Sequence, residues 1–95
     1  MPINVKFFAT FRDLLGLKEL ELEMEPGETL KLIDLFEWLF QKFGEKFRNR
    51  ILEGGNIRSQ VTIMINGRNI KFLDGVNSPL KDGDTVALFP PVYGG

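Results

Sequence analysis

The sequence has no cysteine and no histidine among its 95 residues. Without cysteine, the chain has no disulfide, thiolate nucleophile, iron–sulfur cluster or cysteine-ligated zinc. Without histidine, it lacks the commonest general base and the commonest metal ligand. Any chemistry must therefore come from carboxylates, hydroxyls, lysines, arginines or the chain ends, and the sequence predicts no metal site.

The sequence also lacks an excess of one charge and a long apolar run. Its 12 basic and 13 acidic residues give a net charge of −1, which argues against a nucleic-acid partner because such proteins need a basic face. The apolar stretches fall well short of the ~20 residues that span a bilayer. Residues 1–4 do not resemble a secretory signal. We therefore expect a cytoplasmic protein of one domain, with no membrane partner.

Two segments near the N-terminus alternate apolar and polar residues, which is typical of strands with one buried face. The first covers residues 3–10 and the second residues 18–25, which Pro26-Gly27 ends as a turn. Between them, residues 11–16 break the alternation and predict a short helical turn that closes at Gly16. The polar side of the second strand is acidic, formed by Glu19, Glu21, Glu23 and Glu25.

Residues 29–43 change to the spacing of an amphipathic helix. We expect Thr29 as its N-cap and Gly44 just after its end, although a start nearer Asp34 also fits the pattern. The apolar stripe should pack in the core, with Trp38 half exposed. It consists of Leu32, Ile33, Phe36, Leu39, Phe40 and Phe43.

Residues 45–59 are mostly polar and predict a loop. Phe47, Ile51 and Leu52 are its expected anchors in the core. The same loop contains the basic run Arg48-Asn49-Arg50, for which a solvated surface is favoured over contact with phosphate.

The last third of the sequence predicts three further strands. Residues 60–65 and 68–72 flank Asn66-Gly67, a strong hairpin signal because both residues tolerate the positive φ of a type I′ turn. Asp82-Gly83-Asp84 marks a turn rather than a metal site. Residues 85–89 are nearly all apolar, as expected for a central strand that is buried on both faces.

The predicted order of elements is ββαβββ, and a helix that connects parallel strands crosses over in the right-handed sense. With the last strand in the middle and parallel to the first, the fold is an α+β, β-grasp (ubiquitin-like) roll. It would have a mixed sheet of four to five strands with one main helix packed across it. We expect residues 1–89 to form this domain and residues 90–95 an extended tail ending in Gly-Gly.

The tail carries the clearest chemical signal. Pro90 and Pro91 stop strand pairing because each lacks an N–H and has a fixed φ, and they stiffen the exit from the sheet. Gly94 and Gly95 have no Cβ beside the terminal carboxylate, so the tip can thread a narrow channel. Such an arm suits an active site that activates its carboxylate as an acyl group, for example by attack on ATP. The alternative is an ordinary frayed end.

The sequence resembles the MoaD family, the small subunits of molybdopterin synthase and related sulfur carriers. The resemblance is strongest in residues 80–92, Leu-Lys-Asp-Gly-Asp followed by Val-Ala-Leu-Phe-Pro-Pro-Val, and in the terminal Gly-Gly. Residues 5–9 with Arg12 and Gly16 match the family's first strand and loop, and Asn66-Gly67 matches its hairpin. The chain departs from the family in a helix region about two residues longer and in Tyr93, where relatives have a small residue.

The resemblance implies that Gly95, next to the slim Gly94, is adenylated by an ATP-dependent activating enzyme and converted to a thiocarboxylate. The sulfur would pass to a pterin precursor inside a MoaE-like large subunit. The chain would then be a non-catalytic subunit with no tightly bound cofactor, since ATP is used by its partner. The residues implied to contact partners are Phe8, Arg12, Phe89, Pro90, Pro91, Val92 and Tyr93.

Several alternatives stay open at this point. Phe8 and Phe89 can instead belong to the core, and Arg12 can be a solvated loop charge. A ubiquitin-like modifier joined to lysines through Gly95 would have the same tail. A sulfur carrier for thiamine or tRNA thiolation, or an interaction module with an inert tail, also fits.

Overall fold

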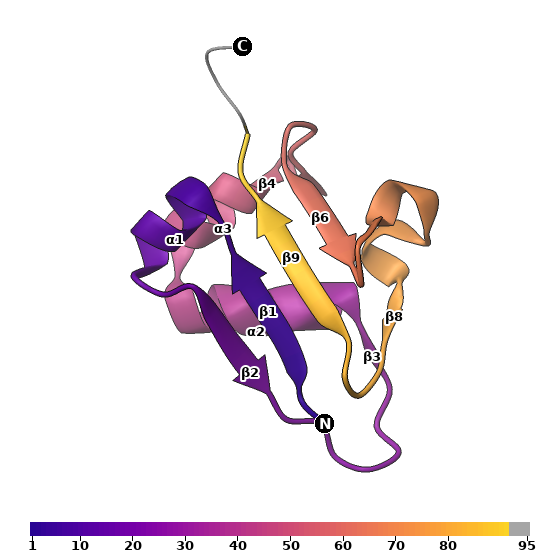
Figure 1. Ribbon diagram of the computed structural model, residues 1–95. Coiled ribbons are helices and arrows are strands. Elements are labelled where there is room, and N and C mark those ends of the chain that lie inside the picture. Colours follow the sequence, from indigo (N-terminus) through magenta and orange to yellow (C-terminus); the bar gives the residue numbers. More distant parts are fainter. Residues whose placement is uncertain (92–95) are drawn as a thin grey trace.

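The first and last strands of the chain lie side by side in the middle of one sheet. The computed structural model describes residues 1–91, and its five-stranded sheet has the order β2-β1-β9-β6-β7. β1 is parallel to β9, and the other neighbouring strands are antiparallel. Figure 1 shows β9 at the centre, with its C-terminal end at the upper edge of the sheet. The five strands are β1 (Ile3–Phe7), β2 (Glu19–Leu22), β6 (Thr62–Ile65), β7 (Arg68–Asn69) and β9 (Thr85–Phe89).

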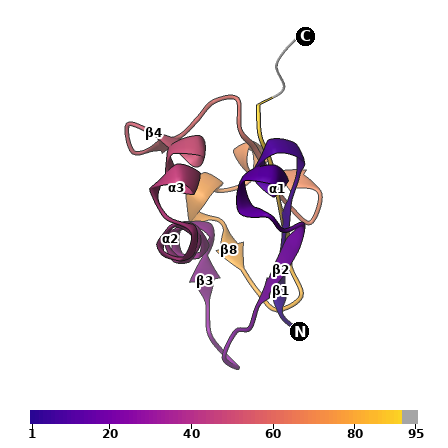
Figure 2. The ribbon, with the colours of Figure 1, turned by 90° about the vertical axis from the view of Figure 1, so that its left-hand side faces the viewer.

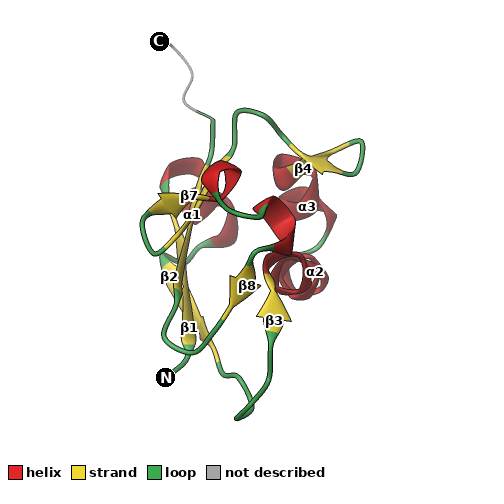
Figure 3. Ribbon diagram, turned by 90° about the vertical axis from the view of Figure 1, so that its right-hand side faces the viewer, coloured by secondary structure: helices red, strands yellow, loops and turns green. Residues whose placement is uncertain are grey.

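The two helices α2 (Leu32–Phe43) and α3 (Glu45–Ile51) pack on one face of this sheet, as the side view in Figure 2 shows. The short helix α1 (Ala9–Leu15) follows β1 directly. The remaining elements are η1 (Ile70–Phe72), η2 (Gly75–Asn77) and two small ladders, β3 (Leu30–Lys31) with β8 (Pro79–Leu80) and β4 (Leu52–Glu53) with β5 (Asn56–Ile57). Figure 3 shows the first ladder beside α2. Within residues 1–91, no helix combines the length and apolar character needed to cross a membrane.

The core lies between the sheet and these helices. Alternate residues of β1 and β9, such as Val5, Phe7, Val86 and Leu88, are fully buried. A cluster of aromatic rings forms part of this core. The ring of Phe47 lies 6.0 Å from that of Phe7 in an edge-to-face arrangement. This geometry is favourable for aromatic pairs. The inner face of the sheet is therefore the face that stabilises the fold.

The predicted β-grasp architecture is confirmed, including the mixed sheet, the helix across it and the central last strand. The prediction that the last strand is buried on both faces is wrong. Only Val86 and Leu88 of β9 are buried, whereas Ala87 and Phe89 are half-buried on the other face. The run is apolar because one face of β9 packs in the core and the other face also has apolar side chains.

Three predicted boundaries are also corrected. α2 begins at Leu32 rather than at Thr29, because residues 30 and 31 pair with β8 and the Asp34 carboxylate accepts a hydrogen bond from the Lys31 backbone N–H (3.0 Å). The predicted loop after Gly44 contains α3, whose Phe47 and Ile51 are buried as expected. The predicted strand 68–72 pairs only at residues 68 and 69 before η1 begins.

Candidate functional site at the end of the last strand

The chain leaves the sheet from its central strand. Pro90 is buried and Pro91 is half-buried at the end of β9. Because neither has a backbone N–H, the pairing of β9 with its neighbours cannot continue past Phe89. Close to this end of β9, the backbone N–H of Phe8 donates to the carbonyl oxygen of Leu88 (3.2 Å). Pro90 and Pro91 therefore lie beyond the paired part of β9.

A stacked aromatic pair lies on the outer side of this exit. The rings of Phe8 and Phe89 have centroids 4.4 Å apart and planes inclined by 13°. Both side chains are half-buried, so each retains exposed area. The guanidinium of Arg12 lies 6.0 Å from the Phe8 ring centroid, and its Nε donates to the Phe7 carbonyl oxygen at 3.5 Å. Arg12 is therefore held beside the pair by a cation–π contact and is not a free loop charge.

The rest of the outer face continues from this pair across the sheet. Ala87 is in register with Lys6 on one side and Met64 on the other, and Thr62 is in register with Phe89. All of these side chains are half-buried, while α2 and α3 lie on the opposite face. The outer face is therefore a surface with aromatic and aliphatic area at the exit of the chain, suited to contact with another protein.

The opposite end of β9 is tied down by polar contacts. The buried Asp84 carboxylate accepts from the Asn66 side-chain amide (2.9 Å) and from the Lys81 backbone N–H (3.0 Å). The Asn66 side-chain oxygen in turn accepts from the Thr85 N–H (2.9 Å). The prediction of a turn at residues 82–84 is confirmed, and Asp84 serves to fix the start of β9.

A basic pocket lies at the exit on the side of α3. It has a volume of about 290 Å³ and contains two arginines, Arg50 at the end of α3 and Arg58 after β5. Its other lining residues are Thr10, Phe11, Asn49, Gln60, Pro90 and Pro91. We call it the arginine pocket. The sequence predicts the basic run 48–50 in a loop, whereas the run lies in α3, and no sequence pattern indicates Arg58.

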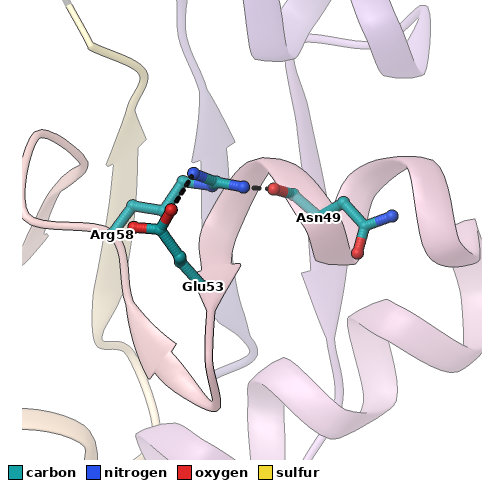
Figure 4. A network of polar contacts seen from close by, with 3 residues as sticks. All are labelled: Asn49, Glu53 and Arg58. Atoms are coloured by element: carbon teal, nitrogen blue, oxygen red, sulfur yellow. Dashed lines mark hydrogen bonds and ion pairs between the residues drawn. The ribbon is translucent and has the colours of Figure 1, made fainter.

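Arg58 has a defined position in the arginine pocket. Its Nε donates to the backbone carbonyl oxygen of Asn49 (2.8 Å), and its Nη1 lies 3.4 Å from a carboxylate oxygen of Glu53. Figure 4 shows the guanidinium between these two groups. A cation at the C-terminal end of a helix is favourable because the last carbonyl groups carry partial negative charge. The contact fixes the β4–β5 hairpin against α3.

The structure brings together most of the site residues predicted from the sequence. Phe8, Arg12, Phe89, Pro90 and Pro91 surround the point at which the chain leaves β9. The other predicted site residues, Val92, Tyr93, Gly94 and Gly95, lie outside the described residues. The roles assigned to all of them stay predictions.

Fold and site together define a ubiquitin-like β-grasp protein whose chain leaves the sheet from the central strand. A family model described as the ThiS family matches residues 5–95. The chain belongs to this family of ubiquitin-like sulfur carriers, which confirms the resemblance to MoaD proteins at the level of the family.

Individual relatives divide between carriers and modifiers. The chain is 35% identical to small archaeal modifier protein 3 of Haloferax volcanii, with all of both chains covered. It is 34% identical to the molybdopterin synthase sulfur carrier subunit of Haemophilus influenzae, over 98% of this chain and 99% of that one. Its fold is similar to the solution structure of small archaeal modifier protein 1 from Methanosarcina acetivorans, with a TM-score of 0.81 and 35% identity over 99% of this chain and 96% of that one.

Proposed function

We propose that Gly95 carries the reacting group of this protein. In the proposed sequence, its carboxylate attacks ATP on a separate activating enzyme, which forms an acyl adenylate and releases pyrophosphate. A sulfur donor then displaces AMP and leaves a thiocarboxylate at the end of the chain. The chain itself is the carrier of the sulfur, and the catalytic groups belong to the activating enzyme.

The observation that supports this proposal most strongly is that the family match continues to residue 95, beyond the point where Pro90 ends strand pairing. The exit also has the surroundings expected for docking. The Phe8–Phe89 pair exposes aromatic area next to it, and aromatic residues are enriched at the centres of protein interfaces. A partner that holds this surface would receive the following residues in its active site.

For the destination of the sulfur, we propose a pterin precursor held by a MoaE-like large subunit, in the biosynthesis of the molybdenum or tungsten cofactor. The support is the 34% identity to a molybdopterin synthase sulfur carrier subunit over nearly the whole length of both chains. In this function the thiocarboxylate sulfur forms a bond to the pterin precursor, and water then hydrolyses the bond between this sulfur and the Gly95 acyl carbon. The sulfur stays on the pterin, and Gly95 returns to a carboxylate for another cycle.

A second candidate function uses the same activated carboxyl group. In a protein modifier, the Nζ amine of a target lysine attacks the carbonyl of the Gly95 acyl adenylate, forms an isopeptide bond and releases AMP. The 35% identity to small archaeal modifier protein 3 over both complete chains favours this possibility. Sulfur transfer for thiamine or tRNA thiolation would require the same first steps and a different acceptor.

Intact-mass spectrometry tests the shared step and then separates the candidates. The chain is incubated with ATP, sulfide and the activating enzyme, and we expect the mass increase of one sulfur replacing one oxygen. Addition of a MoaE-like subunit with the pterin precursor should reverse this increase if the first candidate is correct. Branched Gly-Gly-lysine peptides in cell digests would support the modifier. A chain whose mass never changes under these conditions contradicts the proposed function.

A further inference from the structure

The composition of the arginine pocket favours the binding of an anion. The side chains that line it beside Pro90 and Pro91 include two guanidiniums, two primary amides and a hydroxyl, and none of them is a carboxylate. Guanidiniums are donors only, and their planar fork matches the two oxygens of a carboxylate. The pocket is therefore positive and rich in donors at the place where the chain leaves the sheet.

The acidic groups nearby do not neutralise this charge. Glu53 pairs with Arg58, but the Glu53 side chain is 74% exposed, so water screens the pair and leaves it weak. Within residues 1–91 this is the single ion pair, so Arg50 is without a carboxylate partner in that part of the chain. Arg58 is already held by Asn49 and Glu53, whereas Arg50 is exposed at the end of α3. Arg50 is therefore the guanidinium of the pocket that no carboxylate of residues 1–91 pairs with.

Any protein that encloses the residues after Pro91 must come close to the arginine pocket, because Pro90 and Pro91 form part of its wall. Closure of such an interface removes water from the guanidinium groups. A charge that loses its water without gaining a counter-charge is costly, and the cost opposes binding. Binding of a partner that covers the arginine pocket is therefore favoured when the partner places negative charge against Arg50.

We propose that the arginine pocket is a docking site for an acidic side chain, Asp or Glu, of the activating enzyme that receives the C-terminal residues. The inference rests on the proposed function and adds to it a specific contact on the α3 side of the exit. Together with the aromatic pair on the outer side, this contact would hold the chain from both sides. The partner would then recognise the orientation of this domain as well as the surface beside the end of β9.

The charge distribution supports an orienting role for this contact. The far edge of the sheet, at β2, has exposed glutamates at positions 19 and 21, whereas the two pocket arginines lie at the exit. An acidic surface on the enzyme would be attracted to the exit and repelled by the β2 edge. Charge complementarity of this kind favours one orientation and raises the rate of association.

The test compares Arg50→Glu with Lys81→Glu in the exchange of pyrophosphate with ATP. Both substitutions change the net charge equally, but Lys81 is exposed in the turn at the opposite end of β9. The enzyme used is one that exchanges pyrophosphate with the unaltered chain. We expect Arg50→Glu to raise the KM for the chain about tenfold or more, with kcat nearly unchanged, and Lys81→Glu to leave both constants as they are.

Two further measurements make the result specific. Arg50→Lys keeps the charge but loses the planar guanidinium that can donate two hydrogen bonds to one carboxylate. The KM for this variant should therefore fall between those for the unaltered chain and Arg50→Glu. With rising salt, the KM of the unaltered chain should increase more steeply than that of Arg50→Glu. Thermal unfolding of each variant verifies that the fold is kept, as expected for substitutions at exposed positions.

The outcomes separate this inference from the proposed function. If no activating enzyme exchanges pyrophosphate in response to the unaltered chain, the proposed function is wrong. If the unaltered chain is active and Arg50→Glu has the same KM, the proposed function stands and the docking site is wrong. If Arg50→Glu raises the KM for ATP instead of the KM for the chain, the pocket meets nucleotide phosphate, and the inference of an acidic side chain is overturned.

Discussion

Phe7 and Phe8 are neighbours in the chain, yet they serve opposite faces of the sheet. Phe7 is fully buried on the inner face, with the rings of Phe43 and Phe47 each at 6.0 Å. Phe8 is half-buried on the outer face, where it stacks on Phe89 and lies beside Arg12. The inner residue contributes to the stability of the fold. The outer one contributes less to stability and keeps exposed aromatic area at the end of β9, which is available for contact with another protein.

The two ends of β9 show a similar contrast. At its start, the Asp84 carboxylate and the Asn66 amide satisfy their hydrogen-bonding groups within the protein. At its end, the donors of Arg50 have no carboxylate partner in residues 1–91. Polar groups that are already paired fix the strand in place, whereas unpaired ones at the exit remain available to a partner.

The largest expected effect on stability is at the inner face. Phe7→Ala removes a fully buried ring and leaves a cavity, and such truncations cost about 3–5 kcal/mol of unfolding free energy. Chemical denaturation of the variant measures the loss. A value below that of Phe8→Ala would contradict the assignment of the two faces.

Asp84→Ala should have the next largest effect, because it removes the acceptor for Asn66 and Lys81 at a buried position. The expected loss is about 1–3 kcal/mol. Asp82→Ala, in the same turn but exposed, is the matched control and should change the unfolding free energy by no more than about 0.5 kcal/mol. Equal losses for the two variants would show that the Asp84 network does not stabilise the turn.

Phe8→Ala should separate stability from function. Loss of the half-exposed stack with Phe89 should lower the unfolding free energy by about 1 kcal/mol. By contrast, the KM for the chain in pyrophosphate exchange should rise about tenfold, as for an aromatic residue central to an interface. An unchanged KM would remove the outer face from the proposed contact with the activating enzyme.

The smallest expected effect is a gain in stability at Asn4. Its side-chain oxygen is buried and has no hydrogen-bond partner among the described residues, although it lies in a strand opposite Thr85. Asn4→Val removes the unsatisfied group and adds a β-branched side chain, so it should stabilise the protein by about 1 kcal/mol. A loss of thermal stability in this variant would contradict the assignment of Asn4 as a buried, unsatisfied group.

The sequence predicted those parts of the fold that depend on local pattern. The turn at Asn66-Gly67 is one example, because φ is 51° and 82° at these residues, as a type I′ turn requires. Gly44 likewise ends α2 with a positive φ of 84°. The bounds of β9 matched residues 85–89 because Pro90 ends the apolar run.

The errors have three different causes, and the first is that distant pairing overrides the local pattern. Thr29 is a good cap by type, yet residues 30 and 31 join β8, a segment almost fifty positions later. The apolar residues of β9 suggested burial on both faces because the sequence alone does not show which face the helices cover. Within residues 1–91, α2 and α3 cover the inner face. α3 was missed because its stripe is short, with only Phe47 and Ile51 buried.

Only part of the candidate site was predicted, because only part of it lies in one continuous stretch of sequence. Pro90, Pro91 and the glycines form a continuous motif, and Phe8 and Phe89 came from the resemblance to the family. The arginine pocket combines Thr10, Arg50 and Arg58 with Pro90, which come from four separate parts of the chain. Only the folded arrangement places these residues together, so no local pattern in the sequence indicates the pocket.

The carboxyl group of Gly95 is the proposed reacting group, and deletion of Gly95 tests this proposal. Pyrophosphate exchange is measured with the activating enzyme, ATP and either the intact chain or the chain that lacks Gly95. We expect exchange with the intact chain and only background exchange with the deleted one, at equal thermal stability. Equal exchange by the two chains would contradict it.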